Sequence, residues 1–305
     1  MNNSNNSKDF RSGFVAVVGR PNAGKSTLLN NLLEQKILII SDKPQTTRNK
    51  IRCILTEERG QIIFLDTPGI HKPHHRLGEY MVDSAKGSIK GADYIVYVVD
   101  VTARRGTGDE FVGEIIKNSG VPCILALNKI DLIDSRRLEK IKEDFSKLAD
   151  FKDIIPISAL NGDNTQRVLD QIFQELPLGP MYYPEDEVTD QPERFIAAEL
   201  IREKVLLLTR DEVPHSTAVV IEEMTEKKTL IKIRAVILVE RESQKGIMIG
   251  KSGSLLKEVG RMAREDMEKL LNSKVFLELW VKVRKDWRND KNILKEFGYN
   301  LGKKS

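Results

Sequence analysis

The sequence has few cysteines and no long apolar run, and both absences narrow the kind of protein that it encodes. Among 305 residues only Cys53 and Cys123 are cysteines, far apart in the chain and without CxxC spacing. This argues against a disulfide framework or a zinc site and fits a reducing compartment. No apolar stretch approaches the ~20 residues that a bilayer-spanning helix needs. Residues 1–11 are polar and lack the apolar centre of a signal peptide, so we expect a disordered tail there.

Positive charge is concentrated in the last part of the chain. The net charge is only +4, but residues 227–305 hold 20 Lys and Arg against 10 Asp and Glu. Such a basic segment suggests a polyanionic partner, either nucleic acid or an acidic membrane surface. A solvated charged face would give the same count, so charge alone leaves both interpretations open. The length of the chain favours two domains.

Short apolar runs of β-type residues alternate with helical patterns in the first half. The strand-like runs are residues 14–18, 51–56, 61–65, 94–99, 122–127 and 154–157, and the helical patterns include residues 25–34, 108–118 and 135–149. This alternation predicts an α/β domain, over residues 12–177, with a mostly parallel sheet covered on both faces. Only residues 57–60 separate the second and third runs, which predicts one antiparallel pair at a sheet edge.

A change of composition marks a joint between the two halves. Four prolines and an acidic run fall within residues 177–192, and we interpret residues 178–192 as a linker. Asp190 stands three residues before Glu193, a spacing that resembles a capping box. A helix (195–208), two strands (216–224 and 229–239), a helical region and a last strand (275–283) are expected to follow. The order α-β-β-α-α-β predicts a second, smaller domain over residues 193–305.

One complete nucleotide-binding motif stands after the first strand-like run. The pattern GxxxxGK[ST] is matched by Gly19, Arg20, Pro21, Asn22, Ala23, Gly24, Lys25 and Ser26. The motif lies between a strand and a helix, which is the context that it requires. Its glycines let backbone N–H groups approach phosphates, its lysine adds charge for the β- and γ-phosphates, and its serine offers a hydroxyl to Mg²⁺.

Three further short motifs follow strand-like runs at the edge where open α/β sheets bind ligands. The first is Asp66, Thr67, Pro68 and Gly69, in which the carboxylate can hold the magnesium shell and the glycine N–H can sense the γ-phosphate. The second is Asn128, Lys129, Ile130 and Asp131, in which Asp131 can accept the two N–H groups of guanine that adenine lacks. The third is Ser158, Ala159 and Leu160, which can offer a backbone N–H to guanine O6.

The basic segment contains a short turn of the form GxxG. It consists of Gly250, Lys251, Ser252 and Gly253 and is followed by a helical pattern. Within an α-β-β-α-α-β order it resembles a type II KH domain, whose turn clamps about four single-stranded nucleotides. The candidate RNA-binding residues are this turn with Lys245 and Lys257. Trp280 is expected in the core, with base stacking as the alternative, and for Trp287 both roles stay open.

The four motifs of the first half resemble the boxes of Ras-like, translation-factor-related GTPases, and so imply a P-loop NTPase fold. The resemblance places residues 45–48 in switch I, with Thr47 as the magnesium and γ-phosphate sensor and Thr46 as the alternative. It implies that Ser26, Thr47 and Asp66 hold Mg²⁺, and that Lys25, Thr47, Gly69 and Asn22 act in catalysis. Thr27 joins the expected GTP-binding set. Ile70 stands where Ras-type enzymes carry a water-orienting glutamine, so turnover should be slow.

Over residues 240–260, and more loosely over residues 10–302, the chain resembles the Era family of bacterial GTPases. The resemblance implies a GTP- and GDP-binding switch whose KH domain grips the 3′ end of 16S rRNA during 30S subunit assembly. It also implies a cytoplasmic monomer with peripheral membrane association. Asn22 is typical of the GTPases that recruit K⁺. Two alternatives remain: a second domain that binds a protein or anionic membrane, and an RNA-binding module that holds GTP only as a structural ligand.

Overall fold

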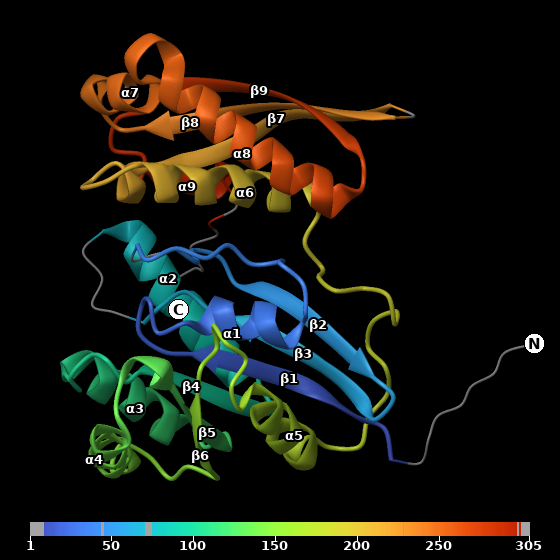
Figure 1. Ribbon diagram of the computed structural model, residues 1–305, viewed down its shortest axis with the longest axis vertical. Coiled ribbons are helices and arrows are strands. Elements are labelled where there is room, and N and C mark those ends of the chain that lie inside the picture. The colour runs from blue at the N-terminus through green and yellow to red at the C-terminus, as the bar shows by residue number, and fades with distance from the viewer. Residues whose placement is uncertain (1–8, 44–45, 71–74, 228, 298, 300–305) are drawn as a thin grey trace, which may run out of the picture. The chain divides into compact units, whose positions relative to one another are not determined.

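The computed structural model describes residues 9–43, 46–70, 75–227, 229–297 and 299 (Figure 1). Residues 1–8, most of the expected tail, therefore lie outside the described residues, as do residues 300–305 at the other end. The described residues form two compact units. The first contains residues 9–38, 47–70 and 81–190, and the second contains residues 39–43 with 46, 75–80, 191–227, 229–297 and 299.

The first unit is built on a six-stranded sheet in the order β2-β3-β1-β4-β5-β6 (Figure 1). The strands are β1 (Arg11–Val18), β2 (Ile51–Glu57), β3 (Gly60–Asp66), β4 (Tyr94–Asp100), β5 (Cys123–Asn128) and β6 (Ile154–Ile157). The helices are α1 (Lys25–Leu32), α2 (Arg76–Lys90), α3 (Thr107–Ser119), α4 (Ser135–Ser146) and α5 (Thr165–Glu175). Strand β2 runs antiparallel to β3 and the remaining pairs are parallel, which confirms the predicted α/β class and its antiparallel edge.

Continuous apolar runs explain why the central strands of this sheet are buried. Every residue of β3 and β5 is buried, as is every residue of β4 except Asp100 at its end. Strands covered on both faces need side chains that tolerate burial on both sides, so these strands read as apolar runs instead of alternating patterns. The polar residues begin where the strands end. This places the motifs of the sequence at one edge of the sheet.

The predicted linker packs along the first unit through its backbone. Gln61 on β3 accepts hydrogen bonds from the N–H groups of Tyr182 and Tyr183, and the Ile54 N–H donates to the Val188 carbonyl. The bond at Ile54 covers part of the outer side of the edge strand β2, which limits pairing with other chains. Asp190 accepts from the Arg52 guanidinium at 2.7 Å.

The capping box expected at Asp190 is wrong. Helix α6 (Glu193–Leu208) has Pro192 at its N-cap, and no described side chain caps it. The carboxylate of Asp190 pairs with Arg52 of β2 instead. A capping spacing describes only local geometry, and here a charge from another element competes for the same carboxylate.

The second unit has the element order predicted from the sequence, with one addition. Its elements are α6, β7 (Ala218–Lys227), β8 (Leu230–Val239), α7 (Glu242–Ile249), α8 (Ser254–Leu271) and β9 (Lys274–Val283), followed by the unpredicted short helix α9 (Lys291–Glu296). The sheet order is β7-β8-β9, with β7 and β8 antiparallel and β8 and β9 parallel. The core joins one face of this sheet to α6, α7 and α8 through residues such as Ile201, Ile233, Met248 and Val259.

Helix α6 carries three consecutive buried charges, which is unusual because charged side chains are rarely buried without partners. Arg202 donates to the Thr46 carbonyl, and a carboxylate oxygen of Glu203 accepts from the Ile40 N–H at 3.0 Å. Lys204 pairs with Glu203 and with Asp266 of α8. The second unit thus holds the segment around residues 40 and 46 through polar bonds to α6.

The two tryptophans occupy opposite environments. Trp287 is fully buried, and its indole N–H donates to the Ser216 carbonyl at 2.8 Å. Trp280 is 57% exposed, so the expectation of a core position is wrong. On β9 alternate side chains point to opposite faces, and Val275 and Val281 take the face that packs on the helices. Trp280 therefore lies on the other face.

Within the described part of the chain, no helix is both long and apolar enough to cross a bilayer.

Replacing Trp287 by alanine should lower the free energy of unfolding of the second unit by about 3–5 kcal/mol, because a large buried ring and its hydrogen bond are lost. The matched change Trp280→Ala should cost less than about 0.5 kcal/mol, because that ring is exposed. Urea denaturation followed by circular dichroism measures both values. Equal losses in the two variants would contradict the assignment of the two environments.

Candidate functional site

The phosphate-binding motif forms the loop between β1 and α1. Gly24 is the N-cap of α1 with φ of 94°, and a Cβ atom there would lie 2.1 Å from Nδ2 of Asn128. Only glycine fits such a position. Among the described residues no side chain caps α1, so its first N–H groups and its positive dipole end are available to an anion.

The ammonium group of Lys25 is buried inside this loop. Its Nζ donates to the carbonyls of Gly19 at 3.3 Å and Arg20 at 3.0 Å. Burial lowers the pKa of Lys25 to about 8, and the negative charge of Asp66 opposes that shift. A buried cation surrounded by the loop's own carbonyls is well placed to bind the phosphate chain of a nucleotide.

Three oxygen donors that the sequence places far apart meet beside Lys25. The Ser26 hydroxyl lies 3.0 Å from the Thr47 hydroxyl and 3.1 Å from Oδ2 of Asp66, and the Thr47 hydroxyl lies 3.2 Å from that same oxygen. The other oxygen of Asp66 is buried and has no hydrogen-bond partner among the described residues. Burial raises the pKa of Asp66 to about 6, while Lys25 and the two hydroxyls oppose the shift.

This donor set fits a magnesium ion. Mg²⁺ binds oxygen ligands, commonly one or two carboxylates together with hydroxyls, waters and phosphate oxygens. The unpartnered buried oxygen of Asp66 is the feature that a cation would satisfy. The neighbouring Thr46 does not join the set, because its hydroxyl donates to the Lys43 carbonyl at 2.6 Å. The structure therefore favours Thr47 over Thr46 as the switch I threonine.

The turn after β3 packs directly on the phosphate-binding loop. A Cβ atom on Gly69 would lie 2.6 Å from the backbone N of Pro21, so glycine is required by close approach. The N–H of Ile70 donates to the Gly19 carbonyl at 3.1 Å, and the Ile70 side chain is buried. The Thr67 hydroxyl donates to the Val17 carbonyl. Position 70 thus offers no polar side chain to a reacting water.

Asn128 joins three of the predicted motifs. Its side-chain amide donates to the Ala23 carbonyl at 2.8 Å and accepts from the Ala159 N–H at 2.9 Å. Lys129 follows in a left-handed conformation with φ of 70°, and its Nζ pairs with Asp100 at the end of β4. Asp131 is exposed in the short helical turn that follows, and Leu160 is exposed after Ser158. Asn128 therefore connects two features that are exposed to solvent, the Asp131 carboxylate and the loop that contains Leu160. Recognition of a base requires such exposed groups.

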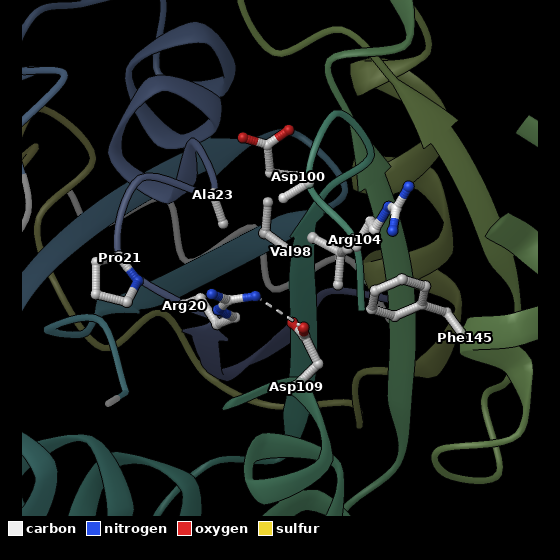
Figure 2. A pocket seen from close by; sticks show the side chains of 10 residues that line it. Arg20, Pro21, Ala23, Val98, Asp100, Arg104, Asp109 and Phe145 are labelled. Atoms are coloured by element: carbon white, nitrogen blue, oxygen red, sulfur yellow. Dashed lines mark hydrogen bonds and ion pairs between the residues drawn. The ribbon is translucent and has the colours of Figure 1, made fainter. Parts of the chain in front are cut away.

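The Arg20 side chain pairs with a carboxylate outside the phosphate-binding loop. Its guanidinium reaches Asp109 of α3 (Figure 2), and both residues line a cavity of about 80 Å³. The Nη1···Oδ2 distance is 3.0 Å, and the Tyr97 hydroxyl donates to the other carboxylate oxygen at 3.3 Å. Burial, with the charge of Asp109, raises the pKa of Tyr97 and keeps it a neutral donor. Arg20 thus serves the site through its backbone carbonyl, which accepts from Lys25.

Sequence reasoning missed the role of Asp109 and Tyr97. Their only signal is local: Asp109 stands at the third position of α3, where an acidic residue often returns to the N-cap backbone, and it does accept from the Gly106 N–H at 2.9 Å. Arg48 of switch I is buried, with 1% of its surface exposed.

The GxxG turn lies between α7 and α8 in the second unit. Gly250, Ser252 and Gly253 all have positive φ, of 73°, 52° and 79°. A Cβ atom on Gly250 would lie 2.9 Å from Cβ and N of Leu255, so this glycine is required twice over. Lys251 and Ser252 are exposed, and no described side chain caps α8. The turn therefore presents backbone N–H groups and a lysine to solvent.

The two other lysines predicted for RNA binding stand on the flanking helices. Lys245 is half-buried on α7, and Lys257 is exposed in the first turn of α8. Both lysines therefore lie on the two helices that flank the turn.

Replacing Asp131 by asparagine should change the preferred nucleotide from GTP to the xanthosine analogue. The exposed carboxylate can accept from both the N1–H and the N2–H of guanine. An amide instead presents one accepting oxygen and one donating NH2 group, which suits the N1–H and the C2 carbonyl of xanthine. We expect the ratio of the two affinities to change by at least about 100-fold. Titration with fluorescent nucleotides measures it, and an unchanged ratio would show that another group recognises the base.

Comparison with known proteins gives the same two parts. A family of 50S ribosome-binding GTPases matches residues 14–129, and the KH domain family matches residues 212–288. The crystal structure of a variant of Aquifex aeolicus Era bound to GDP·AlF4⁻ is 43% identical with a TM-score of 0.92, and the alignment covers 96% of this chain and 100% of that one.

A second Era structure, in complex with MgGDPNP and nucleotides 1506–1542 of 16S ribosomal RNA, is also similar. It is 43% identical, has a TM-score of 0.93, and aligns over 96% of this chain and 100% of its own. With this identity over nearly the full length, and with the phosphate-binding loop, guanine motifs and GxxG turn all in place, the chain belongs to the Era family of GTPases.

Proposed function

We propose that this GTPase is a nucleotide switch whose KH domain binds the single-stranded 3′ end of 16S ribosomal RNA in the assembly of the 30S subunit. The observation that carries the proposal is the exposed GxxG turn with Lys251, in a segment of 20 basic against 10 acidic residues. Its support is the related Era structure that holds nucleotides 1506–1542 of that RNA.

Hydrolysis follows from the residues that surround the phosphates. The loop N–H groups and Lys25 neutralise the phosphate chain, and the Thr47 hydroxyl and Gly69 N–H would approach the γ-phosphate. Mg²⁺, held through Ser26, Thr47 and Asp66, would neutralise charge between the β- and γ-phosphates. Because Ile70 is apolar and buried, no side chain at that position orients the attacking water. We infer that intrinsic turnover is slow.

We propose that K⁺ supplies the positive charge that an arginine finger supplies in other GTPases. Asn22 stands in the phosphate-binding loop with φ of 63°, a conformation that asparagine tolerates, and it offers a neutral amide oxygen. The Arg20 guanidinium is engaged by Asp109 and leaves this role open.

Steady-state turnover at saturating GTP and Mg²⁺ should then be at least about tenfold faster in K⁺ than in Na⁺ at equal ionic strength. The variant Asn22→Ala should lose most of that difference while still binding GDP. Equal rates in the two salts would dispose of the K⁺ hypothesis and leave the GTPase assignment intact.

We propose that helix α6 couples the nucleotide to the KH domain. Within the second unit, Arg202 holds the Thr46 carbonyl and Glu203 holds the Ile40 N–H. Thr47, the candidate γ-phosphate sensor, is the next residue in the chain. Loss of the γ-phosphate releases switch segments in related GTPases. A change at Thr47 is therefore transmitted to the segment that α6 binds.

The alternative function is a second domain that binds a protein or an anionic membrane. The basic count of residues 227–305 fits a membrane surface as well as RNA. We propose a monomer located in the cytoplasm with peripheral membrane contact, and domain limits of 12–177 and 193–305. Co-sedimentation with anionic vesicles tests the membrane contact, and light scattering tests the monomer.

GTP turnover should rise when a short RNA that copies the 3′ end of 16S rRNA is added, and a scrambled RNA should leave it unchanged. The variant Lys251→Glu should abolish the rise, because it places a negative charge where phosphates approach. Lys269→Glu, the same change near the far end of α8, is the matched control and should keep the rise.

Basal turnover should be equal in both variants, because neither residue belongs to the nucleotide site. GTP turnover that does not change when the RNA is added would favour the protein or membrane partner. A Lys251→Glu protein whose turnover rises as much as that of the unaltered protein would favour it too. Absence of multiple turnover would instead favour GTP as a purely structural ligand.

A further inference from the structure

Helices α6, α7 and α8 all pack on the same face of the β7-β8-β9 sheet. The core residues Ile231, Ile233, Ala235 and Ile237 of β8 all point toward α6, α7 and α8. The alternate residues of β8 and β9 therefore point the other way. This second face, which we call the open face, carries Lys232, Arg234, Phe276, Glu278, Trp280 and Lys282, with Val236 buried between them.

Two large aromatic side chains are exposed on the open face. Trp280 is 57% exposed and Phe276 is 50% exposed, and both belong to the edge strand β9. Four residues of strand separate them by about 13 Å, so they lie on the same face without covering one another. Exposed aromatic pairs of this kind usually mark an interaction surface, because burial of each ring would have stabilised the folded protein.

Each ring is bordered by basic residues across the sheet. Phe276 is opposite Lys232 on β8, and Trp280 lies between the rows of Arg234 and Lys282. Lys274 starts the same strand and Lys227 ends β7. Five cations thus border the open face against three carboxylates, which are Glu222, Glu223 and Glu278.

These cations have carboxylate partners that a phosphate group can replace. Lys232 is 3.6 Å from Glu278, and Lys274 is 3.7 Å from Glu268 of α8. Arg234 pairs with Glu223, and Lys282 pairs with Glu222. All four pairs are at least partly exposed, and ion pairs in water contribute little to stability. A phosphodiester group carries one negative charge, as a carboxylate does, so it can replace these exposed partners at little cost in stability.

We propose that the open face is a second RNA-binding surface, on which Trp280 and Phe276 stack unpaired bases of a single strand. The inference rests on the proposed function, in which the GxxG turn of the same unit binds RNA. A sheet face with exposed aromatic rings stacks two or three bases in other RNA-binding folds, and neighbouring cations then meet the phosphates. Stacking tolerates any base, so this face adds affinity, whereas the turn sets position.

RNA explains the pattern better than a protein partner does. The centre of a protein interface is depleted of charge, whereas here Arg234 and Glu278 stand between the two rings. The rings are separated by a polar row, which suits one base on each ring. Cations outnumber carboxylates along the strands, which suits a polyanion.

The test compares two RNA lengths in the full-length protein with a GTP analogue bound. A four-nucleotide RNA fills only the GxxG turn. A twelve-nucleotide single strand can also reach the open face. Trp280→Ala should weaken the longer RNA by about 5- to 150-fold, the range seen for loss of one stacked base, and should leave the short RNA unchanged. Trp280→Phe should restore most of the affinity.

Leu207→Ala is the matched control, since Leu207 is an exposed apolar side chain on α6 and is 47% exposed. It should change neither affinity. Lys251→Glu should weaken both RNAs, and if it weakens neither, the proposed function fails and not only the second surface. Basal GTP turnover should stay the same in Leu207→Ala.

A direct signature comes from tryptophan fluorescence. The protein has two tryptophans, and only Trp280 is exposed, since Trp287 is buried. Bound bases should quench the emission of the longer complex, and Trp280→Phe should remove that quenching. Equal affinity of Trp280→Ala and the unaltered protein for the longer RNA, without quenching, would overturn the proposal and leave the open face to a protein partner.

Discussion

A buried carboxylate is the constraint on which the nucleotide site depends. Asp66 ends β3 in a fully buried position, and burial raises its pKa to about 6. At neutral pH it is still mainly charged, so it requires positive charge and donors around it. Ser26 from α1, Thr47 from switch I and the nearby Lys25 meet that requirement in part. The same carboxylate thereby ties three separate segments to one point.

The unpartnered oxygen of that carboxylate points to a bound cation. One oxygen of Asp66 lacks a hydrogen bond from any described residue, and Mg²⁺ with a nucleotide would satisfy it. Thr47 is held there by its hydroxyl, while Thr46 is held by Arg202 of α6. Two adjacent residues are therefore bound by two different groups, Thr47 by Asp66 and Thr46 by Arg202. The proposed coupling rests on the covalent continuity of the chain between Thr46 and Thr47.

The sequence predicted the elements whose cause is local. The strands of the first half are apolar runs, and their motifs follow because polar residues start where strands end. The αββααβ order of the second half was also predictable, because its periodicities are clear. Asn128 was recognised as part of a motif, but its bonds to Ala23 and Ala159 were not, since they depend on how loops approach one another.

The wrong predictions share a physical reason. Asp190 has the spacing of a cap, yet it pairs with Arg52 on another element. Trp280 sits in an apolar run, yet only the register of β9 decides which face it takes. In each case an element distant in sequence determines where the side chain lies, and the local sequence pattern holds no information about that element.

The central claim is that one equilibrium links the nucleotide site to the RNA-binding domain. It is tested most directly by the Kd for the 3′-end RNA, measured at one salt concentration with GDP and with a non-hydrolysable GTP analogue. The account predicts different affinities in the two states, and reciprocity requires that RNA change the ratio of nucleotide affinities by the same factor. Identical RNA affinities would contradict it and leave a GTPase domain and an RNA-binding domain that act independently.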